Sequence, residues 1–256
     1  MKIVQPTFEI IDHNNLLRNI ELGARVCYKS EDKIGPGSDV AIIEKIKNFK
    51  HESVLEHGVI TVKFLTDRGV THELVRHRVA SFSQESTRYC NYSKDKYGNE
   101  ISLVDPFFFD PAEPTQNVII PTALMSVSGG PKLFAMGGED GEGVQMNSFD
   151  VWFLTCLWTE WGYNTLTQQF KRSAQEARSV LPNSLKTEIQ VTANVREFRH
   201  ILNLRCSREA HPQIRQIMIP LLREFAKRWP VLFADIAERH IADGNFPAEH
   251  EARQVC

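Results

Sequence analysis

The 256 residues are 42% hydrophobic, which is enough to bury a sizeable core. A net charge of -2 and a pI near 6.5 argue against a protein that binds polyanions over its whole surface. The first fifteen residues hold only a short apolar run, broken by Glu9 and Asp12, and no apolar run approaches the roughly 18 residues that a membrane helix needs. We therefore expect no signal peptide and no membrane partner.

The cysteines are odd in number, lie far apart and form no CxxC pair: Cys27, Cys90, Cys156, Cys206 and Cys256. This pattern predicts reduced thiols in a cytoplasmic protein. It lacks the ligand spacing of a zinc site, and none of the cysteines has a recognisable nucleophile setting.

The N-terminal region is expected to begin with a strand over residues 2–11 and a helix over residues 14–27. The helix would turn four apolar residues toward the core: Leu16, Leu17, Ile20 and Ala24. After a loop over residues 29–38, Asp39 is expected to cap a helix over residues 40–49. Ile42, Ile43 and Ile46 share one face of that helix.

Two histidines and two glutamates fall within residues 51–57, HESVLEH. A zincin HExxH motif would need its second histidine at Leu55, and the inverted form would need one at Ser53. The six-residue separation of His51 and His57 also turns them apart on a helix. The segment therefore favours a locally hydrogen-bonded turn over a metal site.

Residues 59–66 alternate between apolar and polar side chains and predict a strand. Next, a helix is expected to begin near Asp67 and to end with the triplet Arg76, His77 and Arg78, because apolar residues recur at helical spacing: Val70, Leu74, Val75 and Val79. The hydroxyl-rich residues that follow are expected to form a loop.

Residues 76–89 contain three arginines, a histidine, three serines and a threonine, a set that suits an anionic, ring-bearing ligand. Successive helical residues point about 100° apart, so the triplet would serve different groups. Two other interpretations stay open. The cluster can be a solvated basic helix end, or a single-strand nucleic-acid-binding module that stacks bases on Phe82 and Tyr89.

The middle of the chain is predicted to carry an insertion at about residues 98–148, with a strand or hairpin around 118–127. The glycine-rich run over residues 137–143 is acidic and is expected to form an exposed loop. No GxGxxG motif follows a strand, so a dinucleotide-binding fold is not expected.

Residues 149–171 have helical spacing, and their aromatic stripe predicts core or subunit interface: Phe149, Phe153, Leu157 and Trp161. A strand is predicted over residues 187–193, with Thr187, Ile189, Val191 and Ala193 on one face. Asn194 is expected to cap the next helix.

On that helix, four apolar residues form a stripe: Val195, Phe198, Ile201 and Leu202. The opposite side carries Arg196, Arg199, His200 and Asn203. Arg205 falls inside the apolar arc, so it needs a carboxylate, a carbonyl or a ligand to offset its desolvation. An internal salt bridge and a ligand contact are both open. Helices over residues 210–226 and 230–242 are expected to cover the sheet, with a loose tail from Pro247.

Four segments together resemble the flavin-dependent thymidylate synthases. They are Arg76-His77-Arg78 with Ser81, Ser86, Arg88 and Tyr89 in step; HxSxxEH at residues 51–57; ARxxLP at residues 177–182; and Asn194 to Arg205. Three positions depart from the family pattern. Ser83 replaces a common asparagine, Gln84 a common glutamate and Glu73 a common glutamine.

The resemblance implies an α+β fold in which helices flank an antiparallel or mixed sheet. It implies a single domain over residues 1–256, interrupted by the insertion and assembled as a homotetramer with shared active sites. The implied reaction is the reductive methylation of dUMP to dTMP. Its cosubstrate is 5,10-methylenetetrahydrofolate, which leaves as tetrahydrofolate, and its hydride comes from FAD reduced by NADPH.

The resemblance also implies site residues, with Arg205 as the catalytic group that polarises the pyrimidine. The dUMP residues would be Glu73, Arg76, Gln84, Glu85, Ser86, Thr87, Arg88, Arg178 and Arg205. The FAD residues would be His51, Ser53, Arg76, His77, Arg78, Gln84, Asn194, Arg196 and His200. No metal and no nucleic acid are expected. The alternatives are another pyrimidine-directed flavoenzyme or the nucleic-acid-binding module above.

Overall fold

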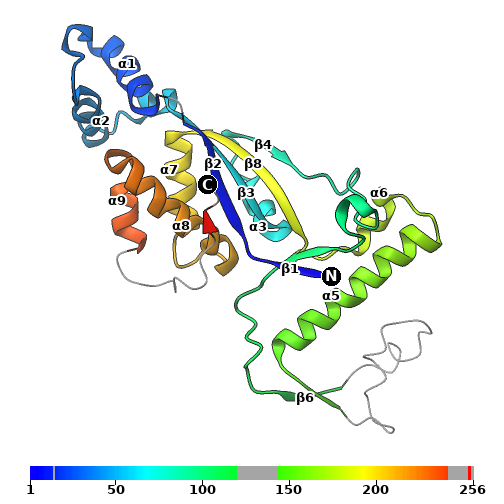
Figure 1. Ribbon diagram of the computed structural model, residues 1–256. Coiled ribbons are helices and arrows are strands. Elements are labelled where there is room, and N and C mark those ends of the chain that lie inside the picture. The colour runs from blue at the N-terminus through cyan, green and yellow to red at the C-terminus, as the bar shows by residue number, and fades with distance from the viewer. Residues whose placement is uncertain (14, 120–142, 242–252, 255–256) are drawn as a thin grey trace. The chain divides into compact units, whose positions relative to one another are not determined.

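The computed structural model describes residues 1–13, 15–119, 143–241 and 253–254. The chain divides into two compact units, and it passes between them more than once (Figure 1). The first unit comprises residues 1–4 and 85–186, and the second comprises residues 5–84 and 187–256. The expected single domain over the whole chain stays a prediction.

The second unit is built on a five-stranded sheet in the order β4-β8-β3-β2-β9. The strands are β2 (Thr7–Asp12), β3 (Val59–Asp67), β4 (Ala80–Gln84), β8 (Lys186–Asn194) and β9 (Arg253–Gln254). β2 pairs with β3 and β4 pairs with β8 in antiparallel fashion, whereas β9 runs parallel to β2. The expected α+β class with a mixed sheet is confirmed.

The central strands follow the predicted alternation. β3 buries Ile60, Val62 and Phe64, and β8 buries Thr187, Ile189, Val191 and Ala193. The prediction of one strand over residues 2–11 is wrong, because β1 (Lys2–Val4) and β2 are separate strands in different units. They are interrupted at Pro6, which has no N–H to donate to a ladder.

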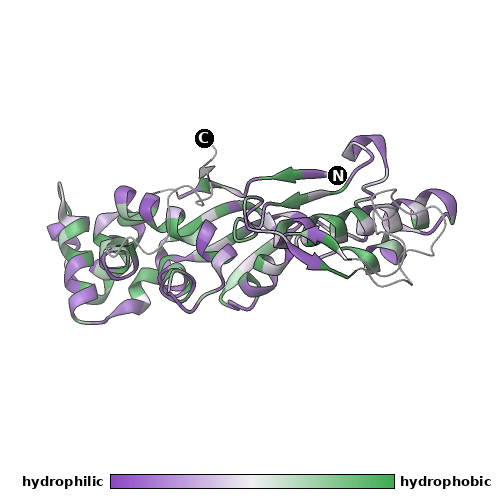
Figure 2. Cartoon of the chain, turned by 90° about the horizontal axis from the view of Figure 1, so that it is seen from below, coloured by the Kyte–Doolittle hydropathy of each residue, from purple (hydrophilic) through white to green (hydrophobic). Residues whose placement is uncertain are grey.

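The longer helices of this unit are α1 (Leu16–Tyr28), α2 (Ser38–Asn48), α7 (Val195–Arg205), α8 (Pro212–Arg228) and α9 (Pro230–Ile241). The helical ribbons carry hydrophobic and hydrophilic residues side by side, as amphipathic helices do (Figure 2). The predicted faces are confirmed for α2 and α7, whose apolar residues are buried. On α1, Leu16, Ile20 and Ala24 are buried, but Leu17 is only half-buried.

The predicted cap of α2 is wrong. The helix begins at Ser38 after Gly37, which has a positive φ of 74°. Asp39 lies in the first turn, where its Oδ1 accepts from the Val40 N–H at 2.8 Å.

The segment that carries Arg76 to Arg88 differs from its prediction in two ways. Asp67 does cap α3 (Arg68–Leu74), but the helix ends before the arginine triplet, and Val75 and Val79 are exposed. Residues 80–84 form β4 and not a loop, because their backbone pairs with β8, with Phe82 opposite Val191.

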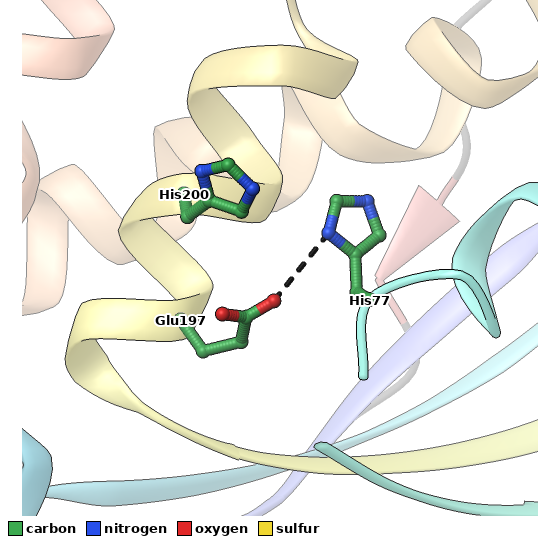
Figure 3. A group of neighbouring side chains, drawn as sticks. All are labelled: His77, Glu197 and His200. Carbon is green, nitrogen blue, oxygen red and sulfur yellow. Dashed lines mark ion pairs between the residues drawn. The ribbon is translucent and has the colours of Figure 1, made fainter. Parts of the chain in front are cut away.

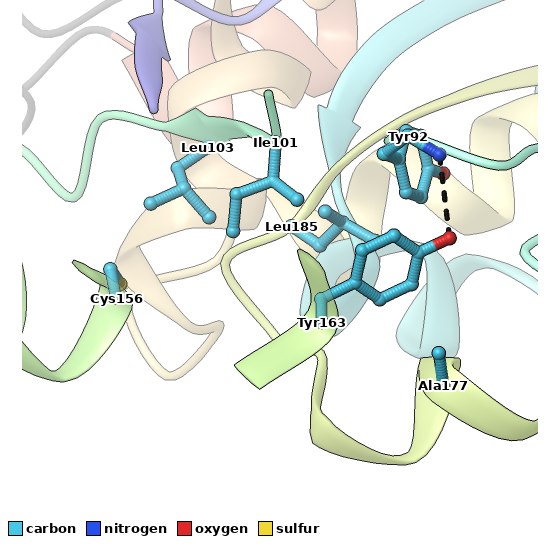
Figure 4. Close-up of a cluster of buried hydrophobic side chains, with 7 residues drawn as sticks. All are labelled: Tyr92, Ile101, Leu103, Cys156, Tyr163, Ala177 and Leu185. Carbon is cyan, nitrogen blue, oxygen red and sulfur yellow. Dashed lines mark hydrogen bonds between the residues drawn. The ribbon is translucent and has the colours of Figure 1, made fainter. Parts of the chain in front are cut away.

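The first unit contains two small sheets. In one, β1 runs parallel to β5 (Ser102–Val104); in the other, β6 (Gln116–Val118) and β7 (Val144–Met146) are antiparallel. Its helical part comprises α5 (Ser148–Asn164), a π-helical turn over Thr165–Gln169, and α6 (Ala174–Ala177). Its core holds Tyr92, Ile101, Leu103, Cys156, Tyr163, Ala177 and Leu185 (Figure 4).

The aromatic stripe predicted on α5 is only half-buried in this unit. The helix instead buries Leu154, Cys156 and Tyr163, and the Tyr163 hydroxyl accepts from the Tyr92 N–H at 3.3 Å. Most of the predicted hairpin (from residue 120), the acidic loop up to residue 142 and most of the predicted tail lie outside the described residues. Among the described helices, none has the length and apolar character needed to cross a membrane.

Candidate active site

Arg205 is held from two sides at the end of α7. Its Nη1 donates to Glu73 Oε2 at 2.7 Å and its Nη2 to the Glu73 carbonyl at 3.1 Å. Its Nε donates to His77 Nε2 at 3.0 Å. The prediction that this guanidinium needs a carboxylate, a carbonyl or a ligand is confirmed by the ion pair with Glu73, in which the Arg205 side chain is 19% exposed, and by the bond to the Glu73 carbonyl. Glu73, a departure from the family pattern, is therefore neutralised by Arg205.

These contacts leave part of the Arg205 fork available. A guanidinium has five N–H donors. Toward the described residues, Arg205 uses three of them, one each on Nε, Nη1 and Nη2. One N–H on Nη1 and one on Nη2 are left for a ligand. The orientation of the fork is set before any ligand binds.

His77 is buried behind Arg205, 5% exposed, and its ring is neutral at pH 7. Desolvation, followed by the charges of Arg205 and His200, lowers its pKa to about 4. Its Nδ1 lies 3.4 Å from Glu197 Oε1, and His200 contacts the ring edge to face (Figure 3). Burial raises the pKa of the Glu197 carboxyl.

His77, Glu197 and His200 bring their donor atoms within 4.8 Å of one another, as the ligands of a metal ion do. Arginine Nε is always a donor, so His77 Nε2 must accept and the single proton of the neutral ring is on Nδ1. A metal ion at Nδ1 would displace that proton and turn Nε2 into a second donor facing Arg205. The arrangement therefore suits a neutral His77 that accepts from Arg205 and faces Glu197 better than it suits a metal centre.

A cavity of about 610 Å³ opens beside the first turns of α7. We call it the α7 pocket; its lining residues are Glu52, Glu56, Val79, Asn194, Arg196, Glu197, Arg199, His200, Asn203, Ile236 and Arg239. Asn194 caps α7, as predicted, by accepting from the Glu197 N–H at 2.8 Å. Arg196 is 51% exposed and donates to Glu56 at 2.7 Å.

The donors of the α7 pocket fit a dinucleotide's diphosphate. Arg196 and Arg239 are exposed cations on facing helices, and Asn194 and Asn203 add amides. Arginine forks match phosphate oxygens bidentately, and a diphosphate can replace the exposed Glu56 as the partner of Arg196. The residues present are therefore able to hold FAD, with Asn194, Arg196 and His200 lining the pocket as expected.

Other expected FAD residues lie elsewhere in the second unit. His51 and Ser53 are exposed, and His51 Nδ1 lies 2.7 Å from the Tyr28 hydroxyl. Arg76 and Arg78 are also exposed, on either side of buried His77. Gln84 is turned inward, and its Nε2 donates to Thr71 Oγ1 at 2.9 Å and to Thr187 Oγ1 at 3.3 Å.

The expected dUMP residues from Glu85 to Arg88, together with Arg178, belong to the first unit. Glu85 accepts from the Tyr92 hydroxyl at 2.9 Å and pairs with Lys186 at 3.0 Å. Thr87 is buried, and Ser86 Oγ accepts from the Arg88 N–H at 3.3 Å. Arg88 donates to Gln175 of α6 at 2.9 Å, and the exposed Arg178 directly follows the same helix.

The cysteine that follows Arg205 is not a nucleophile. Cys206 is 1% exposed, and burial raises the pKa of its thiol well above the usual range. A thiol is nucleophilic only as the thiolate. Cys206 is therefore unsuited to attack a substrate ring beside Arg205.

Known proteins match nearly all of this chain. The model of the family described as "Thymidylate synthase complementing protein" matches residues 9–231. The chain belongs to the flavin-dependent thymidylate synthase family. A Mycobacterium sp. (strain KMS) flavin-dependent thymidylate synthase is 32% identical over 235 residues, covering 88% of this chain and 82% of that protein. The Corynebacterium efficiens enzyme is 31% identical over 231 residues, covering 88% of this chain and 81% of that protein.

Solved structures share the fold. Helicobacter pylori ThyX, crystallised with FAD and dUMP, has a TM-score of 0.65 at 22% identity and covers 91% of this chain and 99% of its own. The Streptomyces cacaoi UMP/dUMP methylase PolB, bound with 5-Br dUMP, has a TM-score of 0.66 at 21% identity and covers 93% of this chain and 97% of its own.

Several residues of the α7 pocket were missed from the sequence: Glu52, Glu56, Glu197, Arg199 and Arg239. The spacing on α7 did place Arg199 on the same side as Arg196. Arg239 lies outside the residues that match the family model, and nothing in the sequence predicted that it lines the same cavity. The flavin-dependent thymidylate synthase motifs include Glu56, but nothing in the sequence assigned it to one cavity with Asn194, Arg196 and His200. Only the folded chain brings residues 52–56 and 239 to α7.

Proposed function

We propose that this chain is a flavin-dependent thymidylate synthase that methylates C5 of dUMP to give dTMP. The observation that carries the proposal is the fixed Arg205, held by Glu73 and His77 in a chain that belongs to this family. The relatives are named for the same activity, and the Helicobacter pylori structure was crystallised with FAD and dUMP.

Arg205 would act on the uracil ring. An unactivated uracil C5 is a poor nucleophile, and a fixed cation beside the ring stabilises the negative charge of a deprotonated or enolate-like form. The two free N–H groups of Arg205 are the donors that would face the ring. Since Cys206 is a protonated, buried thiol, this route needs no covalent attack by that cysteine.

FAD would lie in the α7 pocket, held by Asn194, Arg196 and His200, with further expected contacts from His51, Ser53, Arg76, His77, Arg78 and Gln84. When bound, the flavin supplies the hydride that reduces the transferred one-carbon unit to methyl, and NADPH restores it. The carbon would come from 5,10-methylenetetrahydrofolate, which leaves as tetrahydrofolate. Arg196 orients the cofactor by exchanging its exposed carboxylate partner for phosphate.

The dUMP phosphate and sugar would be held by Arg76, Arg88 and Arg178, assisted by Glu73 and residues 84–87. We propose that residues 84–88 reach the site of a neighbouring chain in a homotetramer. The exposed arginines after α3 (Arg76 and Arg78) and after α6 (Arg178) support this arrangement, because they are more exposed than Arg205 and can reach a ligand of another chain. We also propose that the enzyme works in the reducing cytoplasm, where Cys27, Cys90, Cys156 and Cys206 stay free thiols.

Two measurements test the proposal. The purified protein should show a flavin spectrum that NADPH bleaches. Tritium should be released from [5-³H]dUMP when both NADPH and methylenetetrahydrofolate are present. A colourless protein that does not take up FAD, or one that releases no tritium, would contradict it. Because the Streptomyces cacaoi neighbour is named for UMP and dUMP, the assay should include [5-³H]UMP; faster release from UMP would change the assigned substrate.

A further inference from the structure

We propose that Glu197 is a positioning residue that fixes Arg205 by selecting the tautomer of His77. The inference deepens the proposed function and rests on it only for the role of Arg205 toward substrate. The family resemblance assigns no role to Glu197, which lies on α7 between the expected ligands Arg196 and His200.

The direction of each hydrogen bond supports this assignment. His77 Nε2 accepts from Arg205 Nε at 3.0 Å, and an imidazole nitrogen accepts only when it carries no proton. The neutral ring must then carry its proton on Nδ1. That nitrogen lies 3.4 Å from Glu197 Oε1, and a carboxylate can only accept, so Glu197 favours the tautomer that Arg205 requires.

No other described group in contact with His77 replaces Glu197 in this role. His200 meets the ring edge to face, with centroids 5.6 Å apart, and Arg205 occupies the opposite nitrogen. The Glu197 carboxylate is 12% exposed, so its field at Nδ1 is weakly screened.

The consequence of losing Glu197 follows from the donors. With the proton on Nε2, two N–H groups would face each other across the 3.0 Å contact, and the hydrogen bond would be lost. Arg205 would keep Glu73 on its terminal nitrogens but would no longer be held at Nε. The guanidinium could then rotate, and its two free N–H groups would no longer point in a fixed direction.

A purely structural role for Glu197 predicts a different result. Its carboxylate lies in the first turn of α7, where negative charge stabilises the helix dipole, and its backbone N–H donates to the Asn194 cap. Glu197→Gln loses the charge but keeps an oxygen that can accept from Nδ1. Glu197→Met has a similar length and loses both, so the pair separates charge from hydrogen-bond acceptance.

The first experiment measures the tautomer directly, without substrate. In protein labelled with ¹⁵N-histidine, protonated and unprotonated ring nitrogens resonate far apart, and His77→Gln assigns the signal. We expect Nε2 of His77 to be unprotonated in the wild type and in Glu197→Gln, and to become partly protonated in Glu197→Met. Glu52→Met, which removes a pocket carboxylate that no described contact joins to His77, serves as the matched control and should leave the tautomer unchanged.

The second experiment measures turnover at saturating FAD. We expect Glu197→Met to lower kcat/KM for dUMP about tenfold, the scale of losing a partner behind a functional histidine, and Glu197→Gln to restore most of it. An unchanged tautomer in Glu197→Met would overturn the inference. So would equal losses in the Gln and Met variants, because charge in the pocket would then be the cause. If the wild type does not convert dUMP, the proposed function fails, and the tautomer measurement still decides the role of Glu197.

Discussion

Two arginines on the same helix differ in how the chain holds them. Arg205 is 19% exposed and fixed by a carboxylate, a carbonyl and an imidazole. Arg196 is 51% exposed and pairs with Glu56 and Glu52 at the surface. Exposed ion pairs contribute little, so a ligand can replace those partners. Arg205 is therefore oriented by the protein itself, whereas the exposed contacts of Arg196 leave it able to turn toward a ligand.

Replacing Arg205 should give the largest effect on catalysis. We expect Arg205→Ala to lower kcat by about 10² to 10³, the range for removing one preorganised donor, with FAD retained. Arg205→Lys keeps the charge but loses the fork, so it should recover only part of the activity. Steady-state rates and the bound-flavin spectrum check this. Normal turnover by Arg205→Ala would remove the catalytic assignment.

His77, the buried partner of Arg205, should also make the stability of the protein depend on pH. Because His77 has its pKa lowered to about 4, the unfolded chain binds a proton between about pH 6.5 and pH 4 that the folded chain does not. This destabilises the protein as pH falls through that window, by roughly 2–3 kcal/mol for a shift of this size.

Urea unfolding at pH 7 and pH 4.5 measures this loss. Other groups also make the protein less stable in acid. Desolvation raises the pKa of Asp235, but hydrogen bonds from Arg199 and Lys47 outweigh it and lower that pKa, so protonating Asp235 also destabilises the fold. The difference between wild type and His77→Gln isolates the imidazole. An identical pH dependence in both proteins would show that His77 is not buried and neutral.

The exposed arginine should affect binding more than chemistry. We expect Arg196→Ala to weaken FAD binding about tenfold, the effect of one charge-assisted hydrogen bond, with kcat nearly unchanged at saturating FAD. Flavin fluorescence titration measures it. An unchanged FAD affinity would rule out Arg196 as a cofactor residue and would contradict the placement of FAD in the α7 pocket.

The smallest effect is expected from the partner of Arg196. If FAD displaces Glu56, then Glu56→Gln should tighten FAD binding two- to threefold, because the surface pair contributes only about 0.2–1 kcal/mol. The same titration applies, with Glu188→Gln, an exposed carboxylate paired with Lys63 elsewhere on the sheet, as the control. Weaker binding by Glu56→Gln would mean that Glu56 orients Arg196 for the cofactor.

Strong local patterns predicted much of the second unit. Three features each depend on a few neighbouring residues: the alternation in β3 and β8, the cap at Asn194 and the buried direction of Arg205. The sequence alone was therefore sufficient to predict them. β4 was missed because it alternates serines with half-buried residues and is defined by pairing with residues 189–193, more than a hundred positions away. The acidic lining of the α7 pocket was missed for the same reason.

The division into two units was not predicted, because residues 1–4 and 5–12 look like one strand until their partners are known. Whether Arg88 and Arg178 join Arg205 in an assembled site stays a prediction of the resemblance.

The order of strands has a consequence during synthesis. β8 lies between β4 and β3, yet it leaves the ribosome about a hundred residues after them. The nascent chain can pair β2 with β3, but β4 has to wait, with an unsatisfied edge, while the whole first unit emerges. Chaperone contact at Ala80–Gln84 would therefore be most useful until translation has passed Asn194.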